Sequence, residues 1–441
     1  MVRGMKVLLI GSGAREHAIA WKLVQSARLS RLFVAPGNAG TAQIAENVEL
    51  ALPATTASSD EITAYLGAAV RLARELRVEL AFVAPDAPLA WGLVDALEAA
   101  GIAAFGPTSA AARLESSKSW AKQLMQRHRV PHTPTKSFDD VEAAKEYVRA
   151  SRGAVVVKAD GLAIGKGAIV TSTIEGALAA IEELSAFGEA GSRLTIEPRV
   201  IAREVSAHAF SDGRSIAAMP LSCDHKAVFD GNRGPNTGGM GVYSPAWWAA
   251  PSLADDITNQ VIAPLVHGMA DESVPFRGVI YPGVFATPDG AQVFECNARF
   301  GDPEAQALLV RLEGDLLEIA MACVEGRLSR VPIAWSDRAS VVVVMAANGY
   351  PGAYSTGVPI HGLDAIDPDV LVFHAGTRFG EDGSVVTAGG RVLAVTATAA
   401  TLEAARAKAY DNVARISFAG AHYRRDIAVQ DSTPDRLRAR Q

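Results

Sequence analysis

The strongest constraint on the fold is the regular alternation of short apolar runs and helix-forming stretches over the first 105 residues. The predicted strands are Met5–Ile10, Arg31–Ala35, Leu80–Ala84 and Ile102–Phe105. The predicted helices are 16–27, one with its N-cap at Ser59, and 88–100. Strands that alternate with helices predict a parallel sheet whose ligands bind beyond the carboxyl ends of the strands. We therefore expect residues 1–108 to form an N-terminal α/β domain.

A glycine-rich turn, Gly11–Glu16, joins the first predicted strand to the first helix. A dinucleotide-binding GxGxxG loop would need glycine where Glu16 stands, and no acid ends the strand Arg31–Ala35 to hold a ribose. A nicotinamide-dependent oxidoreductase is therefore disfavoured. A helix N-terminus behind such a turn binds anions. The turn is either a site for a phosphate-bearing substrate or a tight structural turn, and the sequence leaves both open.

A second glycine-rich stretch follows the apolar strand Ala154–Lys158. It is not a Walker A loop, because only three residues separate Gly161 from Gly165 and a strand follows instead of a helix. A glycine-rich hairpin with lysines at its base and tip predicts a mobile flap over phosphate groups. The alternative is a flexible hairpin whose lysines are solvated.

Residues 224–243 are predicted to form a long structureless loop that contains five glycines and the tripeptide Pro235-Asn236-Thr237. A loop of this length inside a compact domain is usually either functional or disordered. Disorder normally brings charge and few apolar residues. Apolar side chains such as Phe229 and Tyr243 can hold this loop in place, so we favour a functional loop.

Polar side chains end a predicted strand, Ala291–Asn297, which pairs with Arg277–Ala286 through a turn at Asp289-Gly290. Strict alternation would put Val293, Glu295 and Asn297 on one face of this strand, with Phe294 and Cys296 on the other. Glu295 and Asn297 would then offer two oxygen ligands to one Mg²⁺ ion. The alternative is an ordinary strand end with solvated polar residues.

The last part of the chain predicts a small α+β domain over residues 331–441, beginning near Val331-Pro332. The predicted strands are Ser340–Ala346, Val370–Ala375 and Arg391–Thr396, and Thr401 caps a helix after them. No catalytic cluster is evident in this part of the sequence.

Charge and cysteine content narrow the class of protein. A formal net charge of −6 and a pI near 5.9 argue against a nucleic-acid-binding surface. Three widely spaced cysteines without a CxxC pair fit a reducing compartment and give no zinc signature. The longest apolar run, Ala339–Ala347, is shorter than the ~20 residues that span a bilayer. We therefore expect a soluble, cytoplasmic protein that binds neither nucleic acid nor membrane.

Together these stretches resemble the phosphoribosylamine–glycine ligases, or glycinamide ribonucleotide synthetases, of the ATP-grasp superfamily. The matching stretches are Gly11–Ala18, Lys158–Gly167, Asp224–Lys226, Gly234–Gly241, Asn297–Glu304 and Tyr423–Ile427. The fourth and fifth of these are highly specific in combination, and the resemblance runs from Met5 to Ile427. It implies a central ATP-grasp domain at residues 109–330, with a flap subdomain at about 130–200, and a monomer or weak dimer.

The resemblance also implies the reaction. ATP, glycine and 5-phosphoribosylamine would give glycinamide ribonucleotide, ADP and phosphate through a glycyl phosphate, a step of de novo purine synthesis. Such chemistry needs cations and hydrogen-bond donors around the transferring phosphoryl group more than it needs a nucleophilic side chain. The sequence fits, because it has lysines, an arginine and oxygen ligands and no evident Ser-His-Asp arrangement.

Residue roles follow from the resemblance, position by position. Glu295 and Asn297 match the ligands of Mg²⁺ or Mn²⁺, and Arg299 and Lys158 match catalytic cations. The implied ATP-binding residues are Lys118, Lys158, Gly161, Gly165, Glu197, Val200 and Glu204. The implied contacts to glycine and phosphoribosylamine are Gly13, Arg15, Asp224 and Asn236.

The sequence departs from the family pattern at the hinge beside adenine, where Glu197-Pro198-Arg199-Val200 replaces the usual Glu-Glu-Phe-Leu. Pro198 has no N–H, so an adenine contact through that amide is in doubt, although Val200 could supply another. Two rival hypotheses remain. One is a ligase for a different carboxylate or amine, and the other is an ATP-binding regulatory protein that has lost catalysis.

Overall fold

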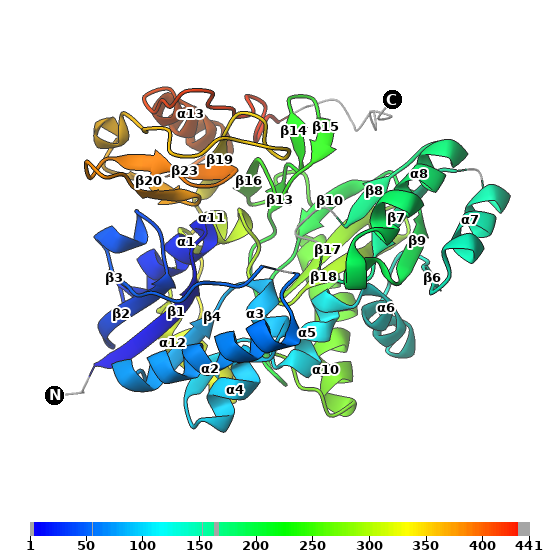
Figure 1. The fold of residues 1–441 in the computed structure, drawn as a ribbon, viewed down its shortest axis with the longest axis horizontal. Coiled ribbons are helices and arrows are strands. Elements are labelled where there is room, and N and C mark those ends of the chain that lie inside the picture. Colours follow the sequence, from blue (N-terminus) through cyan, green and yellow to red (C-terminus); the bar gives the residue numbers. More distant parts are fainter. Residues whose placement is uncertain (1–3, 55, 152, 163–166, 431–441) are drawn as a thin grey trace.

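The computed structural model describes residues 4–54, 56–151, 153–162 and 167–430. Figure 1 shows an N-terminal sheet at the lower left, a C-terminal sheet above it and a third layered unit at the right. Two central strands, β17 (Arg277–Thr287) and β18 (Gly290–Asn297), lie between these parts. Within the part of the chain that the structure describes, no helix is long and apolar enough to cross a membrane.

The N-terminal sheet is parallel, as the alternation of strands and helices predicts. Its order is β3-β2-β1-β4-β5, and every neighbouring pair runs parallel. Its strands are β1 (Met5–Gly11), β2 (Leu29–Pro36), β3 (Glu46–Asn47), β4 (Leu80–Val83) and β5 (Ala103–Phe105). Helix α1 (Ala14–Leu23) follows β1, and α2 (Ser59–Leu76) lies between β3 and β4.

Two helix boundaries in this domain differ from prediction. The N-cap of α2 is Ser58 instead of Ser59, and its hydroxyl accepts a hydrogen bond from the Glu61 N–H at 3.3 Å. The predicted helix 88–100 is two helices, α3 (Asp86–Ala90) and α4 (Leu93–Ala99). Gly92 separates them with φ of 87°, a left-handed conformation that glycine adopts without strain.

The layered unit at the right of Figure 1 is a four-stranded antiparallel sheet covered by two helices. Its order is β6-β9-β7-β8, with β6 (Lys136–Phe138), β9 (Leu194–Pro198), β7 (Val155–Ala159) and β8 (Ala168–Val170). Helices α7 (Val141–Ala150) and α8 (Ile174–Ser185) share one apolar core with it. The antiparallel pair β7–β8 confirms the predicted hairpin of strands, while its tip, 163–166, lies outside the described residues.

The four-stranded sheet β6-β9-β7-β8 is one of two central sheets. The second central sheet has the order β10-β17-β11-β12, and β18 pairs with β17. Two of its strands, β10 (Arg203–Ser206) and β11 (Ala209–Asp212), both pair with β17. The remaining strand is β12 (Ile216–Ala218). The helices of this region are α5 (Ser109–Ser116), α6 (Lys118–Arg127), α9 (Pro251–Ile257), α10 (Ala263–Asp271), α11 (Glu304–Leu309) and α12 (Leu316–Val324).

The C-terminal sheet includes strands from the middle of the chain. Its order is β13-β16-β19-β23-β20. The strands are β13 (Cys223–Asp224), β16 (Gly241–Ser244), β19 (Ala339–Ala346), β23 (Arg391–Ala399) and β20 (Val370–His374), and α13 (Leu402–Val413) packs against β19 and β23. Because β13 and β16 flank residues 225–240, both ends of the predicted functional loop are fixed in this sheet.

Residues 224–243 are not structureless, so that prediction is wrong. Between β13 and β16 the chain forms a hairpin of β14 (Ala227–Phe229) and β15 (Arg233–Asn236), at the upper centre of Figure 1. Apolar side chains from β14 and the turn before β16, Val228 and Met240, are buried with Ala346 of β19. Glycine masked the strand signal here, because strand patterns are read from side chains that glycine lacks.

Strand β18 contains a β-bulge that the predicted alternation missed. Glu295 pairs with Gly283 and Val293 pairs with Val284, so Phe294 is an extra residue opposite the β17 strand. Val293 and Glu295 therefore do not share a face. Phe294 and Glu295 both contact Lys226, at 5.4 Å from the ring centre and 2.9 Å from Oε1 respectively.

Candidate active site

The end of β18 carries Glu295 and Asn297, the two predicted metal ligands. They pair with alternate residues of β17 beyond the bulge, which keeps both on one face of the strand. Lys226 Nζ donates to Glu295 Oε1 at 2.9 Å. Burial alone would raise the pKa of Glu295, but the charges of Lys226, Lys158 and Lys118 lower it to about 2. The charges of three lysines from distant parts of the chain therefore act on one carboxylate.

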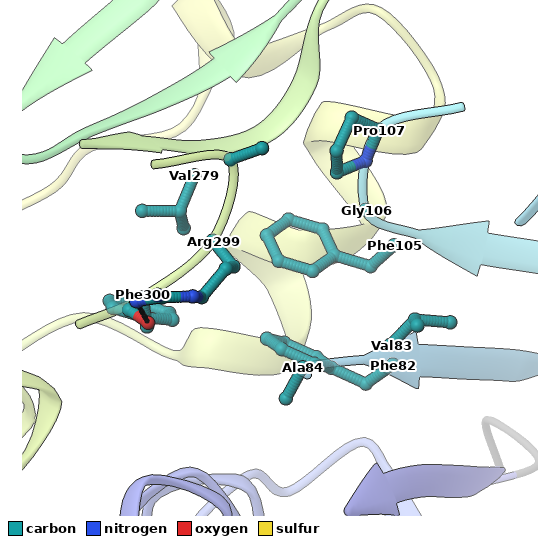
Figure 2. Close-up of a pocket in the computed structure, with 10 residues that line it drawn as sticks. Phe82, Val83, Ala84, Phe105, Gly106, Pro107, Val279, Arg299 and Phe300 are labelled. Atoms are coloured by element: carbon teal, nitrogen blue, oxygen red, sulfur yellow. Dashed lines mark hydrogen bonds between the residues drawn. The ribbon is translucent and has the colours of Figure 1, made fainter. Parts of the chain in front are cut away.

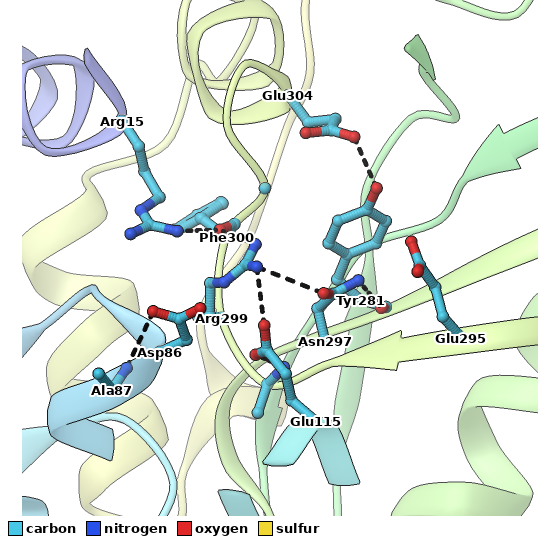
Figure 3. Close-up of polar contacts among 12 residues, drawn as sticks. Arg15, Asp86, Ala87, Glu115, Tyr281, Glu295, Asn297, Arg299, Phe300 and Glu304 are labelled. Atoms are coloured by element: carbon cyan, nitrogen blue, oxygen red, sulfur yellow. Dashed lines mark hydrogen bonds and ion pairs between the residues drawn. The ribbon is translucent and has the colours of Figure 1, made fainter. Parts of the chain in front are cut away.

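Arg299 is held in place directly after the strand (Figure 3). Its Nη2 donates to Glu115 Oε1 at 2.7 Å and to Asn297 Oδ1 at 3.3 Å, and its Nη1 donates to the Phe300 carbonyl at 3.1 Å. Burial would lower the pKa of Arg299, but Glu115 and then Asp86 raise it, so the guanidinium stays charged. The same Glu115 carboxylate accepts from the Ala298 N–H at 2.8 Å. Glu115 thus fixes both the turn and the arginine.

The backbone after Arg299 packs against the carboxyl ends of β4 and β5 (Figure 2). A hollow of about 10 Å³ at this joint is lined by Phe82, Val83, Ala84, Phe105, Gly106, Pro107, Val279, Ala298, Arg299 and Phe300. That volume is about the size of one water molecule. The joint is therefore a packing contact that fixes the turn against the N-terminal sheet, and no substrate fits there.

Glu197 of β9 is the centre of a buried polar cluster. Its carboxylate accepts from Lys158 Nζ at 2.8 Å and from the hydroxyls of Thr133 and Thr135 at 2.7 and 3.0 Å, and Lys122 Nζ lies 3.2 Å away. Burial would raise the pKa of Glu197, but Lys158 and Lys122 lower it. Lys158 Nζ also donates to the Phe294 carbonyl at 2.8 Å. Glu197 therefore orients Lys158 toward β18.

Lys118 lies at the start of α6, beside the segment Asp160-Gly161 that follows β7. Its Nζ donates to the Gly161 carbonyl at 3.1 Å. Asp160 accepts hydrogen bonds from the Ser119 N–H and hydroxyl at 2.6 and 2.7 Å, and these bonds fix the segment after β7 to the first turn of α6. Burial and the neighbouring charge of Lys158 lower the pKa of Lys118. The predicted site residue Gly165 lies outside the described residues.

The predicted hinge lies between β9 and β10. Pro198 ends β9 opposite Val155, and Val200 is partly buried in the connection that follows. Glu204 is exposed on β10. Burial alone would lower the pKa of Lys226, but Glu295 and then Glu204 raise it. The structure therefore brings Glu204 into the same electrostatic field as the end of β18.

The glycine-rich turn Gly11–Glu16 lines a separate cavity, and its Arg15 contacts the turn after β18. Gly13 N–H donates to Glu16 Oε2 at 2.6 Å, so a carboxylate of the chain itself occupies part of this helix N-terminus. Arg15 pairs with the other oxygen of Glu16 at 2.6 Å, and its Nη1 donates to the Phe300 carbonyl at 3.0 Å (Figure 3). A cavity of about 130 Å³ is lined by this turn together with Ala35, Pro36, Leu52, Tyr65 and Pro85.

Asp224 lies at the end of β13 close to Gly239, and Asn236 ends β15. Asp224 Oδ1 is buried and has no hydrogen-bond partner among the described residues. Burial and then the charge of Glu304 raise the pKa of Asp224 well above its usual range. Glu304 itself accepts from the Tyr281 hydroxyl at 2.6 Å (Figure 3). It also accepts from the Ser206 hydroxyl at 2.9 Å.

Sequence reasoning missed several residues that hold this site together. They are Glu115, Lys122 and Arg391, while Asp160 and Lys226 stood in quoted motifs without a role. Glu115 stands only three residues before Lys118, but neither spacing nor pattern shows that its partner is Arg299, 184 residues away. Such pairs are decided by packing between distant elements.

The donor set at the end of β18 fits a hard divalent cation that a nucleotide brings with it. It offers one carboxylate with a low pKa and one amide oxygen. Within the described ranges, no group of three or more His, Cys, Asp or Glu side chains could hold a metal by itself. Mg²⁺ is commonly bound by one or two carboxylates and substrate phosphates, which matches this sparse set.

A four-stranded sheet that faces a second sheet across lysines, and a strand end with a Glu-x-Asn pair, define an ATP-grasp enzyme. Solved structures of lower sequence identity share the fold. One is a biotin carboxylase from Campylobacter jejuni, 16% identical with a TM-score of 0.71, matching 95% of this chain and 93% of that chain.

The chain belongs to the phosphoribosylglycinamide synthetase family. The N, ATP-grasp (A) and C domains of that family match residues 5–115, 116–305 and 340–430. A phosphoribosylamine–glycine ligase of Allochromatium vinosum is 46% identical over 96% of this chain and 98% of the relative, and one of Vibrio parahaemolyticus is 44% identical over 97% and 98%. The crystal structure of such a ligase from Thermotoga maritima is 30% identical, with a TM-score of 0.80, covering 96% of this chain and 99% of that chain.

Proposed function

We propose that the chain joins glycine to 5-phosphoribosylamine with the energy of ATP, giving glycinamide ribonucleotide, ADP and phosphate in purine biosynthesis. The observation that carries the proposal is the set of cations at the end of β18. Lys226 Nζ lies 2.9 Å from Glu295 Oε1, and Lys158 Nζ donates to the neighbouring Phe294 carbonyl at 2.8 Å. The charge of Lys118 also acts on Glu295, and Arg299 stands four residues further on. A carboxylate that attacks a polyanionic γ-phosphate must overcome like-charge repulsion, and positioned cations lower that barrier.

ATP binds between the two central sheets in this proposal, within an ATP-grasp domain at residues 109–330. Lys118 and Lys158 contact its phosphates, and Gly161 lies at the start of the flap, which also contains Gly165. Glu197 acts through Lys158, because its own oxygens are already engaged by lysines and threonines. The adenine contact then uses backbone groups near Val200, and Glu204 takes the ribose hydroxyls.

Glu295 and Asn297 would hold the Mg²⁺ or Mn²⁺ ion that accompanies the nucleotide. When bound, such an ion neutralises charge on the β- and γ-phosphates. Lys226 keeps Glu295 ionised and fixes its direction. Arg299 stays charged and rigid because Glu115 holds it, so it can stabilise the oxygens of the transferring phosphoryl group and of the glycyl phosphate that results.

The two small substrates meet at the turn after β18. Arg15 reaches that turn from the N-terminal domain, and Gly13 lines the adjacent cavity of about 130 Å³, where a phosphoribosyl group would bind. In this proposal Asp224 and Asn236, from the glycine-rich segment between β13 and β16, orient glycine. Closure of the flap would exclude water from the glycyl phosphate, which hydrolyses easily.

The deciding experiment measures ADP release from Mg-ATP by the purified chain. We expect ADP only when glycine and 5-phosphoribosylamine are both present, together with glycinamide ribonucleotide in equal amount. Alanine in place of glycine, and ammonia in place of phosphoribosylamine, are the matched controls. Equal release with either control would assign the chain to a different ligase, and binding of ATP without any turnover would make it a regulatory protein.

A further inference from the structure

The C-terminal domain contacts the glycine-rich segment 225–241, called here the glycine-rich loop, through hydrogen bonds. Arg391, the first residue of β23, donates from Nη1 to the carbonyls of Gly238 and Gly239 at 2.8 and 3.4 Å. The same Nη1 donates to the Asp302 carbonyl at 2.7 Å, and Nη2 lies 3.4 Å from the Asp302 carboxylate. One guanidinium therefore joins the C-terminal domain, the glycine-rich loop and the turn after Arg299.

The loop is packed closely at this point. A Cβ on Gly238 would lie 3.0 Å from the Arg391 guanidinium carbon, and one on Gly239 would lie 2.4 Å from Pro303 Cδ and 2.7 Å from Asp224 Oδ1. Gly239 also has φ of +115°, which favours glycine. The Gly238 N–H donates to the Tyr350 hydroxyl at 3.2 Å, so the C-terminal domain contacts the loop through both its amide and its carbonyls.

A second arginine of the C-terminal segment holds the β14–β15 hairpin. Arg424 is 1% exposed and donates to the Ala227 carbonyl and to Asn232 Oδ1, each at 3.0 Å. Asp426 accepts two hydrogen bonds from Arg424 at 2.7 Å, and it also accepts from the Gly231 N–H at 2.8 Å. The hairpin is therefore fixed at its far end as well.

We propose that Arg391 is a positioning residue that sets the distance between the glycine-rich loop and the turn bearing Arg299, and that the C-terminal domain thereby takes part in placing the amino-acid substrate. The proposal rests on the proposed function, because it takes Asp224 and Asn236 as the substrate-facing residues of this segment. Misplacement by about 1 Å can cost roughly 100-fold in rate, so a clamp of this kind affects turnover without contacting substrate.

An arginine suits this position better than a lysine. Three carbonyl oxygens and a carboxylate surround its planar end, and a guanidinium has five donors in a fixed geometry, whereas an ammonium is a compact charge on a flexible stem. Loss of the guanidinium would remove the donor shared by three carbonyls, two of them in part-buried hydrogen bonds, which is unfavourable. The variant Arg391→Lys should therefore keep the glycine-rich loop in place only in part.

The test compares Arg391→Gln, Arg391→Lys and Arg415→Gln. Arg415 is the matched control, because it also bonds a carbonyl and an aspartate, Ala365 and Asp367, at 2.9 and 2.7 Å within the C-terminal domain but does not contact the loop. Hydrogen exchange reports the loop directly, with or without turnover. Kinetics with glycine and the Kd for ATP report which substrate is affected.

For Arg391→Gln we expect faster exchange of the amides in 236–241, a drop of about 30-fold or more in kcat/KM for glycine, and a Kd for ATP within about threefold of wild type. The exchange rates and kcat/KM of Arg391→Lys should lie between those of wild type and Arg391→Gln, and those of Arg415→Gln should match wild type. The proposal would be overturned if Arg391→Gln and Arg415→Gln had the same amide exchange rates and the same kinetics with glycine. It would also be overturned if Arg391→Gln lowered the affinity for ATP as much as it lowered kcat/KM for glycine. If Arg391→Gln does not fold, the same two outcomes are read from Arg391→Lys. A wild-type chain inactive with glycine would refute the proposed function instead, since the exchange comparison needs no turnover.

Discussion

Lys226 Nζ lies 2.9 Å from Glu295 Oε1, and the two residues come from segments 69 positions apart. The contact joins the start of the glycine-rich loop to the end of β18. Because Lys226 also lies 5.4 Å from the ring of Phe294, its charge is shielded on one side by an aromatic face. The loop with the proposed substrate contacts and the strand with the proposed metal ligands therefore share one ion pair.

Glu295→Ala should lower turnover by about 100-fold or more, a loss of roughly 2.7 kcal/mol of transition-state stabilisation. The reason is that the variant lacks the only carboxylate of the proposed metal site and leaves Lys226 without its partner. Steady-state rates at saturating Mg-ATP measure the effect. Glu272→Ala, which removes an exposed carboxylate on α10's C-cap, is the control and should keep full activity. A Glu295 variant with half the wild-type rate would rule out the ligand role.

Glu115→Gln should reduce kcat through Arg299. The two oxygens of the Glu115 carboxylate accept from the Arg299 guanidinium and from the Ala298 N–H. Glutamine has one carbonyl oxygen and no charge, so it would weaken both hydrogen bonds. We expect about a tenfold to 100-fold loss in kcat, with little change in the Kd for ATP. The double variant with Arg299→Ala should be no slower than Arg299→Ala alone, because residues that act as a unit are non-additive. Additive losses would show that Glu115 acts independently of Arg299.

Glu197→Gln and Glu204→Ala should weaken ATP binding more than they slow the chemical step. Glu197→Gln removes the charge that holds Lys158 and Lys122, while Glu204→Ala removes the proposed ribose contact. A tenfold increase in the Kd for ATP, about 1.4 kcal/mol, is the expected size. Thr135→Ala is the control for Glu197, because it removes one 3.0 Å hydrogen bond without changing charge. If ATP affinity stayed the same in both glutamate variants, these assignments would be wrong.

Stability should fall on the acid side because two histidines are buried between the N- and C-terminal domains. His17 Nδ1 accepts from the His374 N–H at 2.9 Å. Burial lowers the pKa of His17 to about 3 and that of His374 to about 4, below the ordinary value of 6.5. The unfolded chain therefore binds more protons than the folded chain below pH ~6.5, so the free energy of unfolding decreases as the pH falls toward 4.

Each histidine contributes a slope of up to about 1.4 kcal/mol per pH unit in that window. His17→Gln should flatten the slope of unfolding free energy between pH 6.5 and 4.5, measured by denaturant titration at several pH values. His267→Gln is the control, because His267 is exposed on α10. An unchanged slope in His17→Gln would show that the acid sensitivity arises elsewhere.

The sequence by itself determined the parallel N-terminal sheet, the β7–β8 and β17–β18 pairings and the ATP-grasp class. These features depend on local patterns: apolar runs of strand length, helix caps, an Asp-Gly turn and short motifs in fixed order. The motifs also selected Glu295, Asn297 and Arg299 as proposed site residues, because all three lie within five residues of one strand end.

Only the tertiary structure decided what holds those residues. Glu115 meets Arg299, Lys226 meets Glu295 and Arg391 meets Gly238 across 184, 69 and 153 positions. The bulge at Phe294 and the hairpin inside the glycine-rich loop also depend on partners from other strands. Charge pairs and irregular strands of this kind form because burial leaves polar groups that must be satisfied, and the chain's packing chooses the partner.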